Sequence, residues 1–171
     1  MKIKKQIVFF IIVGIVLLAV LPAIPVSAAS RQATISGPKE AQIGQSFTVT
    51  LGFSPAEKTR SSDFDITYDN NLIQLTGISK ASNVADKVLP ESASGAKSPL
   101  KVGVIHYGDG VSADKILYLQ FKVIAKGSVT IKITSASDGV DGNTVSAGAS
   151  RTIELTDAST TTAKTTSPTT T

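Results

Sequence analysis

The chain has 171 residues, enough for one domain of ordinary size, and it contains no cysteine and no tryptophan. Disulfide staples, thiol chemistry and cysteine-bound metals are therefore excluded. The sequence has 17 basic and 13 acidic residues, but four basic residues lie at its ends: Lys2, Lys4, Lys5 and Lys164. Residues 31–157 thus carry 13 basic and 13 acidic side chains, and such a neutral domain offers nucleic acid no electrostatic attraction.

Residues 1–28 have the pattern of a secretory signal peptide. Lysines precede an apolar run over 7–21, two prolines follow the run, and Val26-Ser27-Ala28 presents small residues where signal peptidase cleaves. We expect cleavage after Ala28 and a secreted, extracellular protein. An uncleaved membrane anchor is the alternative, although the apolar run is short for a bilayer span.

Alternation of apolar and polar residues, which is typical of half-buried β-strands, dominates the chain after the leader. It is clearest over 46–53, where Phe47, Val49, Leu51 and Phe53 alternate with small or polar residues. The other predicted strands are 31–35, 63–68, 72–78, 84–89, 100–107, 115–124, 128–135 and 151–155. No window has helical periodicity.

Eight or nine strands joined by Gly, Pro, Asn and Ser turns predict an all-β fold, an antiparallel β-sandwich with jelly-roll topology. This domain is expected over 29–157, with loops at 54–62 and 137–148. The Thr/Pro-rich tract 158–171 holds no apolar residue larger than Ala163. It is expected to be a disordered linker of the kind that leads to a further module or a wall anchor.

The sequence lacks the patterns of a catalytic centre. His106 is the only histidine, and it shares a strand face with Val102 and Val104, which favours a packed histidine over a functional one. No nucleophile elbow, zinc-binding helix motif or phosphate loop occurs. We predict that the protein is not an enzyme. A carboxylate pair for glycoside hydrolysis stays open as an alternative, with Asp63, Asp109 and His106 as the residues to test.

The oxygen-rich stretch 138–143 is the best candidate for a metal site. Asp138, Asp141 and Asn143 could serve calcium, which prefers oxygen ligands. Their spacing is not that of an EF-hand, however, and Asp-Gly and Asn turns form for backbone reasons alone. A plain turn is favoured, and no cofactor is expected.

Two tyrosines leave a sugar-binding function open. The four phenylalanines after residue 31 fall on inward strand positions, whereas Tyr107 and Tyr118 could point outward. Aromatic faces suit the apolar side of a pyranose ring. A carbohydrate-binding or adhesive cell-surface module is therefore the alternative function.

The stretch 63–79, with Tyr68-Asp69 followed by Leu72-x-x-Leu75, resembles the third and fourth strands of cohesin modules. The resemblance extends over 34–155. Its further parts are Ile43-Gly44, the strands 47–53 and 117–123, and Lys126-Gly127 followed by Val129-x-Ile131-x-Ile133. Cohesins are non-catalytic receptors that hold dockerin-bearing enzymes on cellulosome scaffolds. The resemblance implies a jelly roll, a dockerin-type partner and calcium carried by that partner.

The resemblance also implies a binding face, since strands three, five, six and eight of a cohesin receive the helical dockerin. It places an acidic contact at Asp63, a polar one at Ser61 and an apolar one at Ile105. Alternation independently turns Ile105 and Tyr107 outward, and scattered surface apolar residues are the alternative interpretation. The residues predicted to contact the partner are Ser61, Asp63, Asp65, Ile105, Tyr107 and Asp109.

Overall fold

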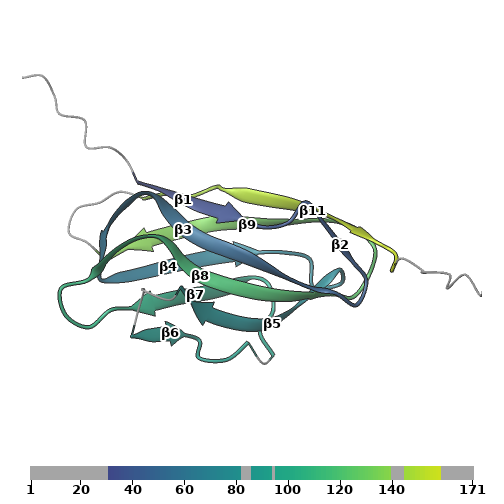
Figure 1. The fold of residues 1–171 in the computed structure, drawn as a ribbon, viewed down its shortest axis with the longest axis horizontal. Helices are drawn as coiled ribbons and strands as arrows, with labels where there is room; N and C mark the ends of the chain where they lie inside the picture. Colours follow the sequence, from purple (N-terminus) through teal and green to yellow (C-terminus); the bar gives the residue numbers. More distant parts are fainter. Residues whose placement is uncertain (1–30, 82–85, 94, 140–144, 159–171) are drawn as a thin grey trace, which may run out of the picture.

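The computed structural model describes residues 31–81, 86–93, 95–139 and 145–158, which form eleven strands in two sheets and no helix (Figure 1). The five-stranded sheet has the order β10 (Val145–Ser146), β1 (Arg31–Ser36), β3 (Ser46–Thr59), β8 (Val111–Val123), β5 (Ile73–Lys80). The six-stranded sheet has the order β2 (Glu40–Gln42), β11 (Ser150–Thr156), β9 (Gly127–Asp138), β4 (Ser61–Thr67), β7 (Leu100–Ile105), β6 (Lys87–Leu89).

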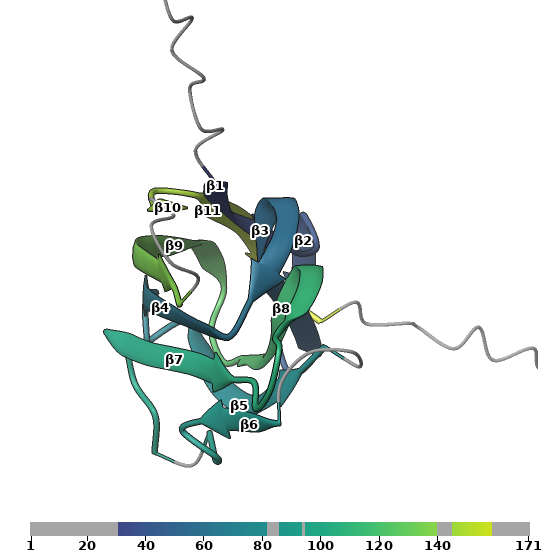
Figure 2. The same cartoon turned by 90° about the vertical axis from the view of Figure 1, so that its left-hand side faces the viewer.

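The two sheets pack face to face, and Figure 2 shows β9, β4 and β7 on one side of the sandwich with β3 and β8 on the other. The predicted all-β sandwich is confirmed. Eleven strands replace the expected eight or nine because β2 and β10 have only three and two residues, too few to show alternation. Their pairings with β11 and β1 are parallel, whereas the other strand pairs are antiparallel as predicted.

Aromatic side chains join the sheets at the centre of the sandwich. Phe53 of β3 stacks on Phe64 of β4 with ring centroids 4.9 Å apart, and Phe121 of β8 meets the edge of Tyr68 at 5.0 Å. These three phenylalanines are fully buried and Phe47 is nearly so, as their strand positions predicted. Burial of such large apolar side chains is the main source of stability in a domain without disulfides.

β3 is longer than predicted, and the expected polar loop over 54–62 is wrong. After a bulge near Gly52, residues 57–59 resume pairing with 111–113 of β8. Gly52 permits this close approach because a Cβ atom there would collide with the Asp114 carbonyl oxygen. The paired segment is mostly polar, so hydrophobic alternation could not indicate it.

A buried ion pair closes one end of the sandwich. The guanidinium of Arg31 contacts the carboxylate of Asp138, and both side chains are 0 % exposed. Arg31 also donates to the Pro55 and Glu57 carbonyl oxygens at 3.2 and 3.0 Å and lies 4.6 Å from the Phe53 ring centroid. Burial lowers the pKa of Arg31, and Glu57 opposes this shift.

Asp138 corrects the expected start of the loop over 137–148 and argues against the calcium alternative. It is the last residue of β9 rather than part of a loop that begins at 137, and Arg31 occupies its carboxylate. A calcium ligand needs a carboxylate open to the ion, so Asp138 does not fit that role. Within the described residues, no group of three or more His, Asp or Glu side chains is placed to hold a metal.

Some expectations concern residues outside the described ranges. These are the leader 1–28, Val84 of the expected strand 84–89, the loop residues Asp141 and Asn143, and the linker beyond position 158. In the part of the chain that is described, no helix has the length and apolarity to cross a membrane.

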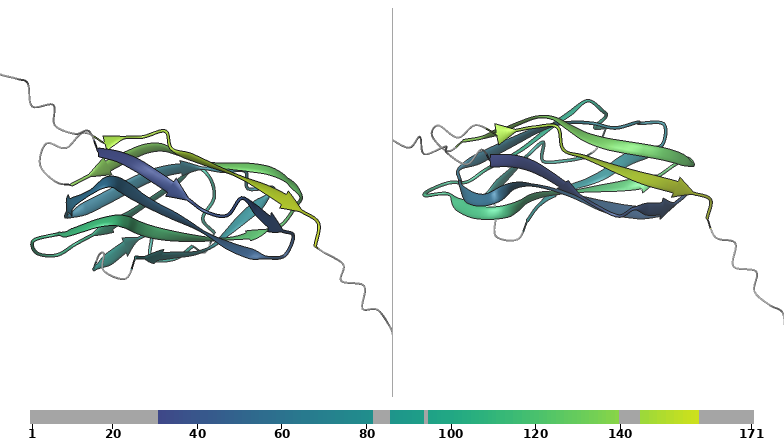
Figure 3. Two further views of the ribbon diagram at one scale, coloured as in Figure 1. Left: turned by 45° about the horizontal axis from the view of Figure 1, so that its top comes forward. Right: turned by 90° about the horizontal axis from the view of Figure 1, so that it is seen from above.

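The described chain enters and leaves the sandwich at opposite ends. Figure 3 shows β1 beginning at one end of the long axis and β11 finishing at the other, in agreement with Figure 1. The two strands lie at the same edge of the sandwich, one in each sheet, and each covers part of its length.

Candidate binding face

The side of β9, β4, β7 and β6 that points away from the core forms a continuous surface, which we call the outer face. Strand register arranges it in rows across β4, β7 and β6. The rows are Ser61–Ile105–Lys87, Asp63–Gly103–Leu89 and Asp65–Lys101. On β9, Ser137 pairs with Asp63 and Ser135 with Asp65. Four of the six residues predicted to contact a partner thus lie together.

The direction of each side chain follows from the burial of the residues that alternate with it along β4 and β7. Phe64 and Val102 are 0 % exposed and Val104 is 1 % exposed, so the alternate positions face outward. Ile105 is half-buried on the outer face, and Tyr107 is 70 % exposed just beyond the end of β7. The structure therefore puts both where alternation predicted them.

Gly103 shapes the centre of the outer face. A Cβ atom at this position would collide with Asp63 Oδ1 and lie 2.9 Å from the Ser62 carbonyl oxygen. The Asp63 carboxylate therefore lies across β7 in the space that a larger residue would fill. Ser137 donates a long hydrogen bond of 3.4 Å to its other oxygen. Asp63 is exposed, so its charge is available at the surface of the sheet.

Asp65, in contrast, is already paired. Lys101 Nζ lies 2.7 Å from Asp65 Oδ1, and the lysine side chain is 71 % exposed. The hydrogen bond and charge of Asp65, with a smaller contribution from Asp63, raise the pKa of Lys101. The row Asp65–Lys101 is thus close to neutral, while Asp63 carries the net negative charge of this part of the face.

The backbone that presents Tyr107 is held from two sides. The Tyr107 amide donates to Asp86 Oδ2 at 2.6 Å, and the His106 amide donates to the Arg60 carbonyl oxygen at 2.7 Å. The Asp86 amide in turn donates to the Ile105 carbonyl oxygen at 2.9 Å. An exposed aromatic ring on a fixed backbone costs little entropy when a partner covers it.

Sequence reasoning missed part of this face. Leu89 is 42 % exposed, and it and Tyr107 are two of the three large hydrophobic residues exposed in the described ranges. Three other members were also missed: Lys87, Lys101 and Gly103. Extending the alternation from Ile105 back along β7 would have found Lys101 and Gly103, whereas β6 has only three residues and no readable pattern.

Two further predicted residues lie apart from the paired rows. Asp109 is exposed in the bend between β7 and β8, after Gly108 with φ of 90°, and it can reach a partner only at the rim. Tyr118 belongs to β8 in the other sheet. Tyr107 and Tyr118 therefore cannot form one sugar platform.

His106 turns inward and is 6 % exposed, as the packed interpretation predicted. Burial lowers the pKa of His106, Asp86 raises it and Lys80 lowers it further. As the pH falls, the imidazole of the unfolded chain takes up a proton near its ordinary pKa of about 6.5. The folded protein takes up this proton only at a lower pH, because burial lowers the pKa of His106. The unfolded state then binds more protons, so stability is lost as the pH falls below about 6.5.

We therefore expect urea denaturation to show a lower free energy of unfolding at pH 5.5 than at pH 7.5. The His106→Gln variant should lose less stability over the same interval, because glutamine does not titrate. Equal losses in the two proteins would assign the pH dependence to other groups.

A family model described as the cohesin domain matches residues 32–166. The chain belongs to the cohesin domain family. No protein with a curated record matches it. The family assignment accounts for the sandwich and agrees with the resemblance seen in the strand 63–68 and its neighbours.

Solved cohesin structures share the fold at low sequence identity. The cohesin module of a family 33 glycoside hydrolase from Clostridium perfringens has a TM-score of 0.64 and 17 % identity, over 77 % of this chain and 100 % of that chain. The sixth cohesin of scaffoldin B from Acetivibrio cellulolyticus, solved in complex with a Cel5 dockerin mutant, has a TM-score of 0.54 and 17 % identity. That match covers 74 % of this chain and 99 % of the other.

Proposed function

We propose that this cohesin domain is a secreted, non-catalytic receptor that binds a dockerin-type module through its outer face. The observation that carries the proposal is the combination of Ile105, Tyr107 and Leu89 beside the charged Asp63. An apolar centre with a polar rim is the usual composition of a protein interface. Exposed apolar residues grouped in this way are typical of a surface that a protein partner covers.

The shape of the outer face suits a helical partner. Small residues lie between its larger side chains and let a partner backbone approach closely: Ser61, Gly103, Ser135 and Ser137. An amphipathic helix could lay apolar residues on Ile105 and Tyr107 while a cationic side chain meets Asp63. The solved relatives in complex with dockerins, which include a Clostridium thermocellum cohesin, support this choice of partner class.

The absence of catalysis is part of the proposal. The single histidine is buried, and Asp63 and Asp109 lie on different parts of the surface, one in β4 and one beyond β7. The charge of Asp65 is compensated by Lys101. These residues thus form no arrangement of acid, base and nucleophile. Membership of the cohesin family supports a binding role in an extracellular polysaccharide-degrading assembly.

The leader and the tail support secretion. Residues 1–28 carry the basic, apolar and small-residue segments of a signal peptide, and the Thr/Pro-rich tract 158–171 is typical of extracellular linkers. We infer a mature protein that begins near Ala29 and acts outside the cell, free or attached to its surface. Calcium is assigned to the partner's loops and not to this domain.

The decisive substitution is Ile105→Lys. It places a charge at the apolar centre of the outer face, and we expect binding of dockerin modules to weaken at least about 30-fold, which is the loss of one interface hot spot. Because Ile105 is only half-buried, the free energy of unfolding should fall by less than about 1 kcal/mol. The measurement is isothermal titration calorimetry against a panel of calcium-loaded recombinant dockerins, with urea denaturation of each variant.

Gln32→Lys is the matched control, since it adds the same charge at an exposed position of β1 in the other sheet. It should leave the dissociation constant unchanged. Chelation of calcium should abolish binding without lowering the melting temperature of the cohesin domain. The outer face would not be the docking site if Ile105→Lys bound dockerins as tightly as wild type does. The same conclusion would follow if the wild-type protein bound no dockerin of the panel.

A further inference from the structure

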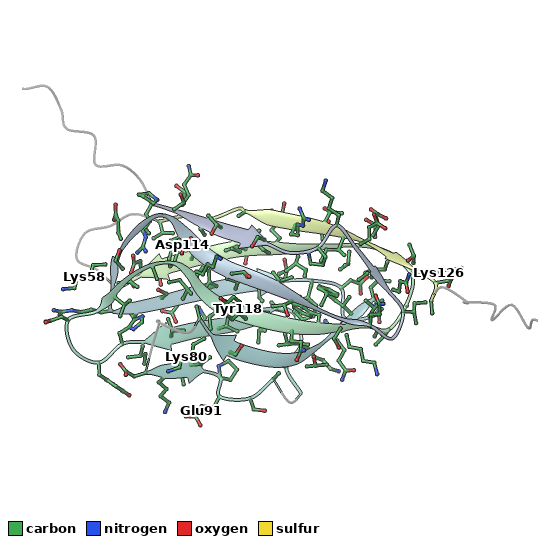
Figure 4. The ribbon with its side chains drawn as sticks, in the orientation of Figure 1. Lys58, Lys80, Glu91, Asp114, Tyr118 and Lys126 are labelled. Atoms are coloured by element: carbon green, nitrogen blue, oxygen red, sulfur yellow. The ribbon has the colours of Figure 1, made fainter. Side chains whose placement is uncertain are left out.

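A second surface feature lies on the opposite side of the sandwich. The outward side of the five-stranded sheet holds a groove of about 310 Å³, within the range of roughly 300–1,000 Å³ typical of small-molecule sites. It is lined by Thr48, Gly77, Ile78, Ser79, Tyr118 and Gln120. Figure 4 labels Tyr118 on β8, near the middle of the sheet nearer the viewer. The outer face belongs to the other sheet and lies on the far side of the sandwich in this view.

The groove follows from strand register. Thr48 of β3 and Gly77 of β5 both pair with Gln120 of β8, and Ser79 pairs with Tyr118. β5 has a bulge between Leu75 and Gly77, which brings the glycine opposite the glutamine. A Cβ atom at Gly77 would lie 3.2 Å from Gln120 Oε1 and 3.3 Å from Gln120 Cβ, so the glycine lets the Gln120 side chain lie against β5.

The Tyr118 ring has a fixed position. It is half-buried and packs against the core residues of the sandwich, although it belongs to the outward side of the sheet. A ring held in this way needs no reorganisation before it contacts a ligand. Of the other lining residues, Thr48, Ser79 and Gln120 are polar. Ile78 pairs with the fully buried Leu119 and packs against the core.

The chemistry of the lining defines the ligand. Tyr118 supplies the apolar contact, the Gln120 amide both donates and accepts, and Thr48 and Ser79 each add a hydroxyl. No charged side chain lines the groove, so an anionic ligand such as a phosphate or carboxylate finds no counter-charge there. A ligand that is uncharged, ring-shaped, apolar on one side and rich in hydroxyl groups fits best.

We propose that this groove binds one pyranose unit of a neutral glycan, with the sugar ring stacked on Tyr118 and its hydroxyls bonded to Gln120, Thr48 and Ser79. The site goes beyond the proposed docking function. It lies in the other sheet, so a glycan and a protein partner can occupy the domain at once. A cohesin domain with this site would hold both a partner enzyme and the polysaccharide that such an enzyme degrades.

Titration of the purified domain with cellohexaose, xylohexaose and mannohexaose, followed by isothermal calorimetry and by ¹H–¹⁵N NMR, tests the site. At least one hexasaccharide is expected to bind and to shift the amides around Tyr118 and Gln120. Tyr118→Ala should weaken that binding about tenfold or more because the aromatic face is lost. Tyr118→Phe keeps the ring and should bind within about threefold of wild type.

Gln120→Ala tests the same groove without changing the packed ring, and it should weaken binding several-fold. Tyr107→Ala is the matched control: it removes an exposed tyrosine from the other side of the sandwich and should bind sugar as wild type does. The proposal is overturned if none of the three hexasaccharides binds at millimolar concentration. It is equally overturned if Tyr107→Ala abolishes sugar binding while Tyr118→Ala and Gln120→Ala keep it.

Discussion

The Asp138→Ala substitution is expected to lower the free energy of unfolding by about 3–5 kcal/mol, which is the usual cost of leaving a buried charge without its partner. Arg31 would keep its hydrogen bonds to the Pro55 and Glu57 carbonyl oxygens, but its counter-charge would be lost. The fully buried hydroxyl of Thr59 would lose its contact with Asp138 but would keep the Ser61 carbonyl oxygen as an acceptor at 2.7 Å. Because the chain has no tryptophan, unfolding in urea is best followed by far-UV circular dichroism.

Asp65→Ala is the control for this prediction, since it breaks the exposed pair with Lys101 and should cost less than about 1 kcal/mol. The double variant Arg31→Leu/Asp138→Leu removes both charges together. It should be more stable than Asp138→Ala, since no unpaired charge is left inside. If Asp138→Ala proved as mild as Asp65→Ala, the end of the sandwich would have to admit water to Arg31.

Phe64→Ala should cost about 3–5 kcal/mol as well, but through an empty volume rather than a charge. Phe64 is 0 % exposed and stacks on Phe53 across the two sheets. Phe53 in turn lies under the Arg31 guanidinium, so the cavity would open beneath the ion pair. Native domains are stable by only about 5–15 kcal/mol, and this variant should therefore melt many degrees below wild type in a calorimetric scan.

Tyr107→Ala serves as the counterpart, because it also removes an aromatic ring but from a site that is 70 % exposed. Its free energy of unfolding should stay within about 0.5 kcal/mol of wild type. The two variants should also differ in binding. Phe64→Ala lies directly behind the outer face and should weaken a dockerin only as far as it unfolds the domain, whereas Tyr107→Ala should weaken binding in a fully folded protein.

The fold was predictable wherever the two faces of a strand differ sharply. In β4, Phe64 and Ile66 are each 0 % exposed while Asp63 lies outside, and the sequence shows this contrast as an alternation of apolar and polar residues. The same contrast fixed the outward direction of Ile105. Prediction failed where both faces are polar, as in the extension of β3 over 54–59.

The ion pair was not predictable, for a different reason. Arg31 was assigned to a strand, but an arginine there is normally solvent-exposed, and nothing local indicates a partner more than a hundred positions away. Asp138 was interpreted as a turn residue because Gly139 follows it. Alternation along β7 could have placed Gly103 and Lys101 on the same face as Ile105. Leu89 could not have been found in this way, because its place on the outer face depends on its pairing with Gly103 of another strand.

The opposite placement of the first and last described strands has a mechanical consequence. Interstrand hydrogen bonds lie perpendicular to their strands, so tension applied through Arg31 and Thr156 along the long axis loads the β1–β3 and β11–β9 ladders in shear. Many bonds then have to rupture together, instead of one after another as in peeling. A domain that connects an anchored surface to a large bound load would resist extension in this geometry.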